Sequence, residues 1–77
     1  MLFMMTDIGS KYIKARVIEY INGKPAWAIV NIKSNTEIAC IAWYPLWKRY
    51  CMVTDTPVVL DVGCMKSVID FISEVTL

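Results

Sequence analysis

The segment from Trp43 to Tyr50 holds the residue types best suited to binding another molecule. Its sequence is Trp-Tyr-Pro-Leu-Trp-Lys-Arg-Tyr, so two tryptophans, two tyrosines, a lysine and an arginine fall within eight residues. Aromatic side chains stack on the bases of single-stranded nucleic acids while cations hold the phosphates. Trp, Tyr and Arg are also enriched at the energetic centres of protein interfaces. The segment therefore indicates a binding surface of one of these two kinds.

The chain lacks the usual parts of a catalytic or metal centre. It contains no histidine, the commonest general base and metal ligand. Its seven acidic residues are scattered and its three glycines are isolated, so neither a carboxylate pair nor a phosphate-binding loop is indicated. Cys40, Cys51 and Cys64 are odd in number and widely spaced, which indicates free thiols. We expect a protein that is not an enzyme and uses no metal or cofactor.

Length and composition predict one small domain whose apolar surface is larger than its core can bury. We expect residues 1–77 to form a single small α+β domain, with 1–10 as a flexible or extra N-terminal extension. Hydrophobic residues make up 57% of the chain and charged residues only 19%. A chain of this size has a marginal core, and part of its apolar surface stays outside it. This favours self-association or a protein partner.

Four segments have the composition of β-strands. The first two flank Asn22-Gly23, the strongest short hairpin signal, because both central positions of a type I′ turn need a positive φ. The third follows a turn at Ser34-Asn35, and Pro45 then interrupts the ladder. A further short extended segment is expected at 58–60. The predicted strands are 12–21, 26–32, 36–43 and 47–53.

A two-residue loop at Asn22-Gly23 sets the expected register. It places Val17 opposite Ala28, and it puts Trp27 on the other face together with Lys14 and Arg16. Extending the pairing to the third strand places Trp43 on the face of Val17. Both faces are substantially apolar, although one helix can cover only one of them.

Residues after Asp61 predict an amphipathic helix. The Asp61 carboxylate is a suitable N-cap, and Lys66 and Asp70 form an i,i+4 ion pair on the wet face with Ser73. An apolar stripe follows helical spacing and is expected to pack on the sheet; its members are Met65, Val68, Ile69, Ile72 and Val75. The expected fold is therefore α+β, an antiparallel sheet of about four strands with one C-terminal helix on one face (ββββα).

The aromatic segment and the helix together resemble a group of small phage and prophage proteins of unknown function. The resemblance lies in the pattern W-Y-x-x-W-x-x-Y at Trp43 to Tyr50, followed by Leu60-Asp61 and a helix containing Ile69-Asp70-Phe71-Ile72. It covers roughly residues 36–74. The resemblance implies an accessory protein of phage type in the cytoplasm of the host cell.

The leading functional hypothesis is a protein-interaction module that binds a host or phage protein, with modulation or inhibition of a host protein as its effect. We also expect a homodimer or higher oligomer, and no membrane segment, because no run approaches the roughly 18 apolar residues required. The alternative is single-stranded nucleic-acid binding, which a net charge of +1 supports only weakly. The expected surface comprises Trp27, Trp47, Lys48, Arg49, Tyr50, Lys14 and Arg16.

Simpler interpretations of these residues remain open. Trp43 and Trp47 could be the largest core residues of a small domain, since Trp is usually largely buried. Lys14 and Arg16 could be solvated charges that keep an edge strand from pairing with another sheet. Strand register favours the core for Trp43, so the functional prediction rests on residues 47–50.

Overall fold

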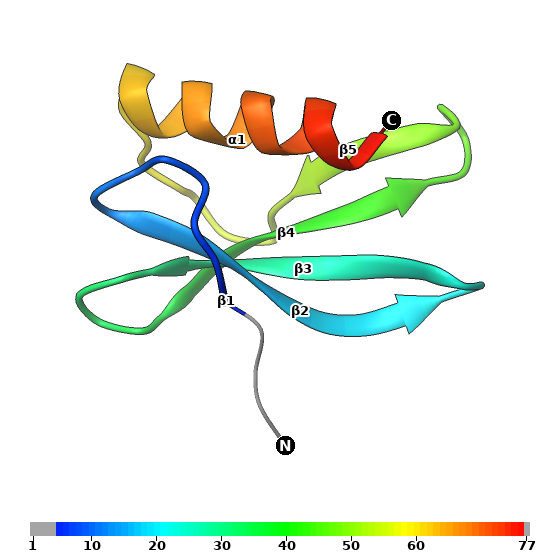
Figure 1. Cartoon of the computed structure of the whole chain (residues 1–77), viewed down its shortest axis with the longest axis horizontal. Helices are drawn as coiled ribbons and strands as arrows, with labels where there is room; N and C mark the ends of the chain where they lie inside the picture. The colour runs from blue at the N-terminus through cyan, green and yellow to red at the C-terminus, as the bar shows by residue number, and fades with distance from the viewer. Residues whose placement is uncertain (1–4, 77) are drawn as a thin grey trace.

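The chain folds into an antiparallel sheet with a C-terminal helix on one face, as the computed structural model shows (Figure 1). The structure describes residues 5–76. The strands lie side by side in chain order. They are β1 (Met5–Thr6), β2 (Ile13–Ile21), β3 (Lys24–Asn31), β4 (Glu37–Tyr44) and β5 (Arg49–Val53), followed by α1 (Val62–Thr76). The expected α+β fold is confirmed, and β1 adds a short unexpected strand beside β2.

The β2–β3 hairpin forms where the sequence predicts it. Asn22 and Gly23 have φ values of 52° and 80°, and Ile21 pairs with Lys24 across the turn. Asparagine and glycine adopt this left-handed conformation at low cost, so the turn closes without strain.

A β-bulge in β2 changes the register beyond this turn. The expected pairing holds as far as Glu19, but Val17 then pairs with Trp27 rather than with Ala28. Ile18 is the extra residue in β2. A shift by one residue exchanges the two faces of the partner strand. The predicted placement of Trp27 on the uncovered face is therefore wrong, and Trp27 faces α1.

The β4–β5 hairpin has a longer turn than the strand prediction allowed. Residues 45–48 form the turn, in which the Trp47 amide donates to the Tyr44 carbonyl at 3.2 Å and Lys48 has a φ of 52°. β5 therefore begins at Arg49, two residues later than expected. No strand forms at 58–60, which belongs to the irregular connection between β5 and α1.

The N-terminus of α1 is capped as predicted. The Cys64 amide donates to the Asp61 carboxylate at 2.8 Å, and the Lys66 ammonium lies 3.1 Å from the Asp70 carboxylate. The capping bond satisfies one of the amides that a helix start leaves without a partner.

The buried stripe of α1 is rotated from the predicted one. Met65 and Ile69 are 44% and 61% exposed, so their predicted place in the core is wrong. Phe71 takes a central position instead, with its ring 5.0 Å from that of Trp27. Burying the larger aromatic ring removes more apolar area from water than burying Met65 or Ile69. The buried residues of α1 are Cys64, Ser67, Val68 and Phe71.

The core lies between α1 and one face of the sheet (Figure 1). It gathers alternate residues of each strand, among them Ile13, Ala15, Trp27, Ile29 and Ile41, with Trp43 packed against them. The prediction that Trp43 faces the helix is confirmed. The strand residues that alternate with these point away from α1, and we call their side the uncovered face. By register it carries Lys14, Arg16, Ala26, Ala28, Val30, Glu37, Cys40, Ala42, Tyr44, Arg49, Cys51 and Val53.

Candidate interaction surface

Two shallow hollows lie along β4 and β5, and their lining includes Cys40, Tyr44 and Val53 of the uncovered face. One hollow of about 370 Å³ lies beside Tyr44 and Trp47, and another of about 320 Å³ lies beside Cys40 and Asp55. Val53 and Thr54 line both hollows, so the two hollows are neighbours, and we call them together the β4–β5 groove. The groove extends along β5 from the β4–β5 turn to the loop that follows Val53.

The turn end of the groove is aromatic. Trp47 is 64% exposed, and its ring packs edge-on against that of Tyr44 with centroids 5.2 Å apart. Leu46 beside it is also exposed. An edge-to-face aromatic pair is favourable beyond the area it buries. Trp47 is thus positioned in solvent rather than folded into the core, as the functional prediction requires.

Two cations stand at the same end. Lys48 and Arg49 are exposed, and the Arg49 guanidinium donates to the Trp47 carbonyl at 3.2 Å. Within residues 5–76 neither forms an ion pair. Both residues line a separate hollow of about 510 Å³ towards the last turns of α1, and neither is among the residues that line the hollow beside Trp47. The turn end therefore combines exposed aromatic rings with free positive charge.

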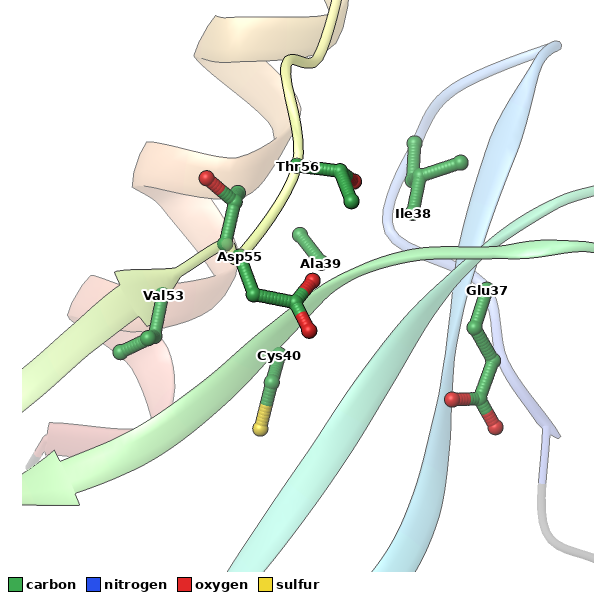
Figure 2. A pocket seen from close by; sticks show the side chains of 8 residues that line it. Glu37, Ile38, Ala39, Cys40, Val53, Asp55 and Thr56 are labelled. Carbon is green, nitrogen blue, oxygen red and sulfur yellow. The ribbon is translucent and has the colours of Figure 1, made fainter.

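The opposite end of the groove is acidic. Asp55 projects from the loop after β5 towards β4, which carries Cys40 and Glu37 (Figure 2). Glu37 forms an ion pair with Arg16 of β2. Burial, and then the nearby carboxylates of Glu19 and Glu37, raise the pKa of the Cys40 thiol. Because the thiolate is the nucleophilic form, this environment makes Cys40 a weak nucleophile.

Two residues predicted for the surface lie in the core. Trp27 and Tyr50 are 8% and 7% exposed. Tyr50 lies between Trp27 and Trp43, with ring centroids 5.7 Å and 5.6 Å away, and its hydroxyl donates to the Pro25 carbonyl at 3.0 Å. Burial raises the pKa of Tyr50. Neither side chain can serve as a platform on the surface of this fold.

Lys14 and Arg16 lie on the uncovered face, but not beside Trp27. Lys14 pairs with Val30 of β3, and Arg16 reaches across β3 to Glu37. The bulge in β2 explains the separation, because it moved Trp27 to the opposite face. Of the predicted surface residues, only Trp47, Lys48 and Arg49 come together.

The sequence analysis missed several groups that shape this surface. Glu37 and Asp55 define its acidic end, although 17 intervening residues separate them in the chain. Lys24 was also missed, and its ammonium lies 4.3 Å from the centre of the Trp43 ring. No local pattern marks these residues, because only the pairing of β4 with its neighbours brings them to their places.

Acidic and cysteine side chains are the remaining candidates for a metal-binding or reactive site. Within the described part of the chain no group of three or more acidic or cysteine side chains is arranged to hold a metal ion. Cys64 is buried beside the Ser10 hydroxyl, with sulfur and oxygen 3.9 Å apart. Burial and a hydrogen bond to Asp61 raise the pKa of the Cys64 thiol.

Comparisons with known proteins add no family to this description. No protein-family model, curated protein or solved structure matches the chain. Between residues 5 and 76 no helix is long and apolar enough to cross a membrane. The resemblance to phage proteins stays a prediction, and the function is inferred from the surface itself.

Proposed function

We propose that this protein is a non-enzymatic protein-interaction module that binds its partner through the β4–β5 groove. The observation that carries the proposal is the Trp47–Tyr44 pair, with Trp47 64% exposed on the uncovered face. Exposed tryptophan next to a hollow is typical of the anchors that dominate protein interfaces. The turn hydrogen bond and the contact with Tyr44 hold Trp47 in place before binding. Such ordering reduces the entropy lost on association.

We further propose that the module acts in the cytoplasm of a host cell, as an accessory protein of phage type that modulates or inhibits a host protein. The support for this part is the aromatic pattern from Trp43 to Tyr50 and the free state of Cys40, Cys51 and Cys64. Free thiols are the usual state of cysteine in a reducing cytosol.

Site-specific photo-crosslinking tests the interaction surface. A photoreactive amino acid is placed at Leu46, which borders Trp47 and is 81% exposed, or at Val59, which is 96% exposed in the loop before α1. We expect protein adducts from position 46 and none from position 59. Adding Trp47→Ala to the first variant should remove the adducts. Equal adducts from both positions, or none from either, would contradict the proposal.

The exposed basic residues beside Trp47 favour binding of single-stranded nucleic acid as a second candidate function. Lys48 and Arg49 stand beside the exposed Trp47, which is the combination used to hold phosphates and stack bases. Against it, Glu37 and Asp55 place negative charge at the far end of the same groove. Fluorescence anisotropy with a labelled oligonucleotide separates the two. Binding that weakens with salt and with Lys48→Glu would favour nucleic acid, and no binding at low salt would remove this candidate.

A further inference from the structure

We propose that the outer edge of β5 binds an extended peptide of alternating acidic and apolar residues as a further strand of the sheet. The peptide belongs to the protein partner of the β4–β5 groove, so the inference rests on the function proposed above and names the chemistry that the partner presents. Three features of β5 carry it. They are its open edge, a basic hollow on the side of α1, and an apolar hollow on the other side.

The outer edge of β5 is open, because β5 is the last strand of the sheet within residues 5–76 (Figure 1). It pairs with β4 without a bulge, from Arg49 opposite Tyr44 to Val53 opposite Cys40. In an antiparallel pair every second residue directs its N–H and C=O away from its neighbour. β5 therefore presents backbone donors and acceptors that a further strand can use.

The opposite edge of the sheet is protected from such pairing. β1 covers part of β2, where Met5 pairs with Arg16 and Thr6 pairs with Ala15. The β-bulge at Ile18 then interrupts the ladder of β2 beyond the covered part. Very short edge strands and bulges are two ways in which proteins prevent a sheet edge from pairing. Since β5 has a regular ladder and no covering strand among the described residues, it is the edge suited to binding.

The hollow on the α1 side of β5 is basic. It measures about 510 Å³, and its lining residues are Lys48, Arg49, Tyr50, Ile72, Ser73 and Thr76. Both cations are exposed, and in the described part of the chain neither has a carboxylate partner. The residues that α1 contributes to the lining are uncharged. An acidic side chain of a bound strand can therefore pair with Lys48 or Arg49 there.

The hollow on the other side of β5 is mainly apolar. It measures about 370 Å³, and its lining residues are Tyr44, Trp47, Cys51, Met52, Val53 and Thr54. Trp47, Met52 and Val53 are 64%, 37% and 48% exposed. An apolar side chain of a bound strand removes this surface from water, which favours binding.

The two hollows flank the same strand, and this sets the pattern of the peptide. Tyr50 faces α1, whereas Cys51 and Val53 face away from it. Successive residues of a bound strand likewise point to opposite sides of the sheet. An acidic residue that reaches the basic hollow thus places its two neighbours in the peptide on the side of Trp47. The matching peptide alternates acidic and apolar residues.

The edge strands of this chain do not have the matching pattern. β5 reads Arg-Tyr-Cys-Met-Val and contains no acidic residue. β2 contains a single acidic residue, Glu19. The open edge of β5 therefore fits a strand of a different protein better than an edge strand of a second copy of this chain.

Fluorescence anisotropy on the full chain tests the inference with a synthetic peptide. The probe is a labelled peptide of alternating valine and glutamate, about eight residues long, which exceeds the five residues of β5. One control peptide has the same composition with its valines and glutamates in two blocks, and another has lysine in place of glutamate. The alternating acidic peptide should bind at least about tenfold more tightly than either control.

Backbone methylation of the probe tests whether it binds as a strand. In a strand at the edge of a sheet, one alternate set of N–H groups points to the neighbouring strand and the other set points to solvent. Two further probes carry N-methyl groups on all the valines or on all the glutamates. Methylation should abolish the binding of one of these probes and leave the other within about threefold of the parent peptide.

Charge reversal on the protein tests the basic hollow. The double variant Lys48→Glu/Arg49→Glu should weaken binding of the acidic probe at least about tenfold and should bind the lysine probe instead. Lys33→Glu/Lys66→Glu is the matched control, because both of these lysines are exposed and neither lines either hollow. Its affinity for the acidic probe should equal that of the wild type. Circular dichroism should show that both variants are folded.

Three results would overturn the inference. They are equal binding of the alternating and block peptides, loss of binding in both methylated probes or in neither, and an affinity that ignores the charge reversal. A wild type that sediments as a dimer and does not bind the probe would also overturn it, in favour of a second copy at this edge. The proposed function fails differently, through the absence of protein adducts at Leu46. Adducts at Leu46 without peptide binding would refute the added strand and leave the interaction module standing.

Discussion

Replacing Trp27 by alanine tests the register that the bulge in β2 imposes. Trp27 is 8% exposed, and its ring contacts those of Phe71 and Tyr50. A buried tryptophan removes about 150–250 Å² from water, worth roughly 4–6 kcal/mol at about 25 cal/mol per Å². Core Trp→Ala substitutions cost about 3–5 kcal/mol. A chain of 77 residues has only about 4–12 kcal/mol of stability in total. We therefore expect Trp27→Ala to be close to unfolding without denaturant.

Trp47→Ala is the matched control, because it removes the same side chain from a site that is 64% exposed. Its loss is mainly the edge-on contact with Tyr44, so the cost should stay below about 1 kcal/mol. Urea unfolding followed by far-ultraviolet circular dichroism measures both. With a slope near 1 kcal/mol per molar, the midpoint should fall by about 3 M or more for Trp27→Ala. Equal losses for the two variants, or a larger loss for Trp47→Ala, would refute the burial of Trp27.

The remaining predictions concern three polar side chains, Asp61, Tyr50 and Cys40. Hydrogen bonds from the first turn of α1 lower the pKa of Asp61 below 3.8. The Asp61 carboxylate therefore stabilises the fold fully at pH values above 3.8, and this stabilisation disappears as the pH falls through the lowered pKa. Asp61→Asn keeps the oxygen acceptor, and thermal unfolding should show less loss of stability in acid than the wild type; an unchanged acid profile would contradict this. Tyr50→Phe removes the 3.0 Å hydrogen bond to the Pro25 carbonyl and should cost about 1 kcal/mol in urea unfolding. The raised pKa of Tyr50 also means that its phenol stabilises the fold below pH 10 and ceases to do so as the pH rises through the raised value, which an ultraviolet titration should show as one late ionisation. Burial first, and then neighbouring carboxylates, raise the pKa of Cys40 above 9.0. Mass spectrometry can follow the alkylation rate of Cys40 against pH; the midpoint should lie above 9.0 and should move down in Glu37→Gln. A midpoint below 9.0 would show that the thiol is not held in its neutral form.

Local signals in the sequence were enough to locate most elements. Asn22-Gly23 predicted the β2–β3 turn, and Asp61 predicted the start of α1, because each acts through its own backbone or that of the next turn. Pro45 predicted the break after β4, but Trp47 was expected to begin the next strand, and whether it was exposed or buried was left open. The α+β fold could therefore be inferred without knowledge of long-range contacts.

The composition of each face could not be inferred in this way. The two-residue loop predicted a regular ladder, and the single extra residue at Ile18 moved Trp27 from the uncovered face into the core. Tyr50 was expected on the surface, but the space between Trp27 and Trp43 buries it. Met65 and Ile69 fit the helical stripe as well as Phe71 does, and only the fit against the sheet decides which of them is buried.

The sequence by itself determined the approximate positions of β2 to β5, where the turns and the helix cap lie, and that an aromatic and basic segment begins at the end of β4. Only the tertiary structure decided which face each side chain occupies, and that Asp55 and Glu37 close the far end of the groove that begins at Trp47. The physical reason is that turns and caps form from bonds between near neighbours in the chain. Strand register is instead set by packing and pairing across the whole sheet, where one bulge exchanges the two faces.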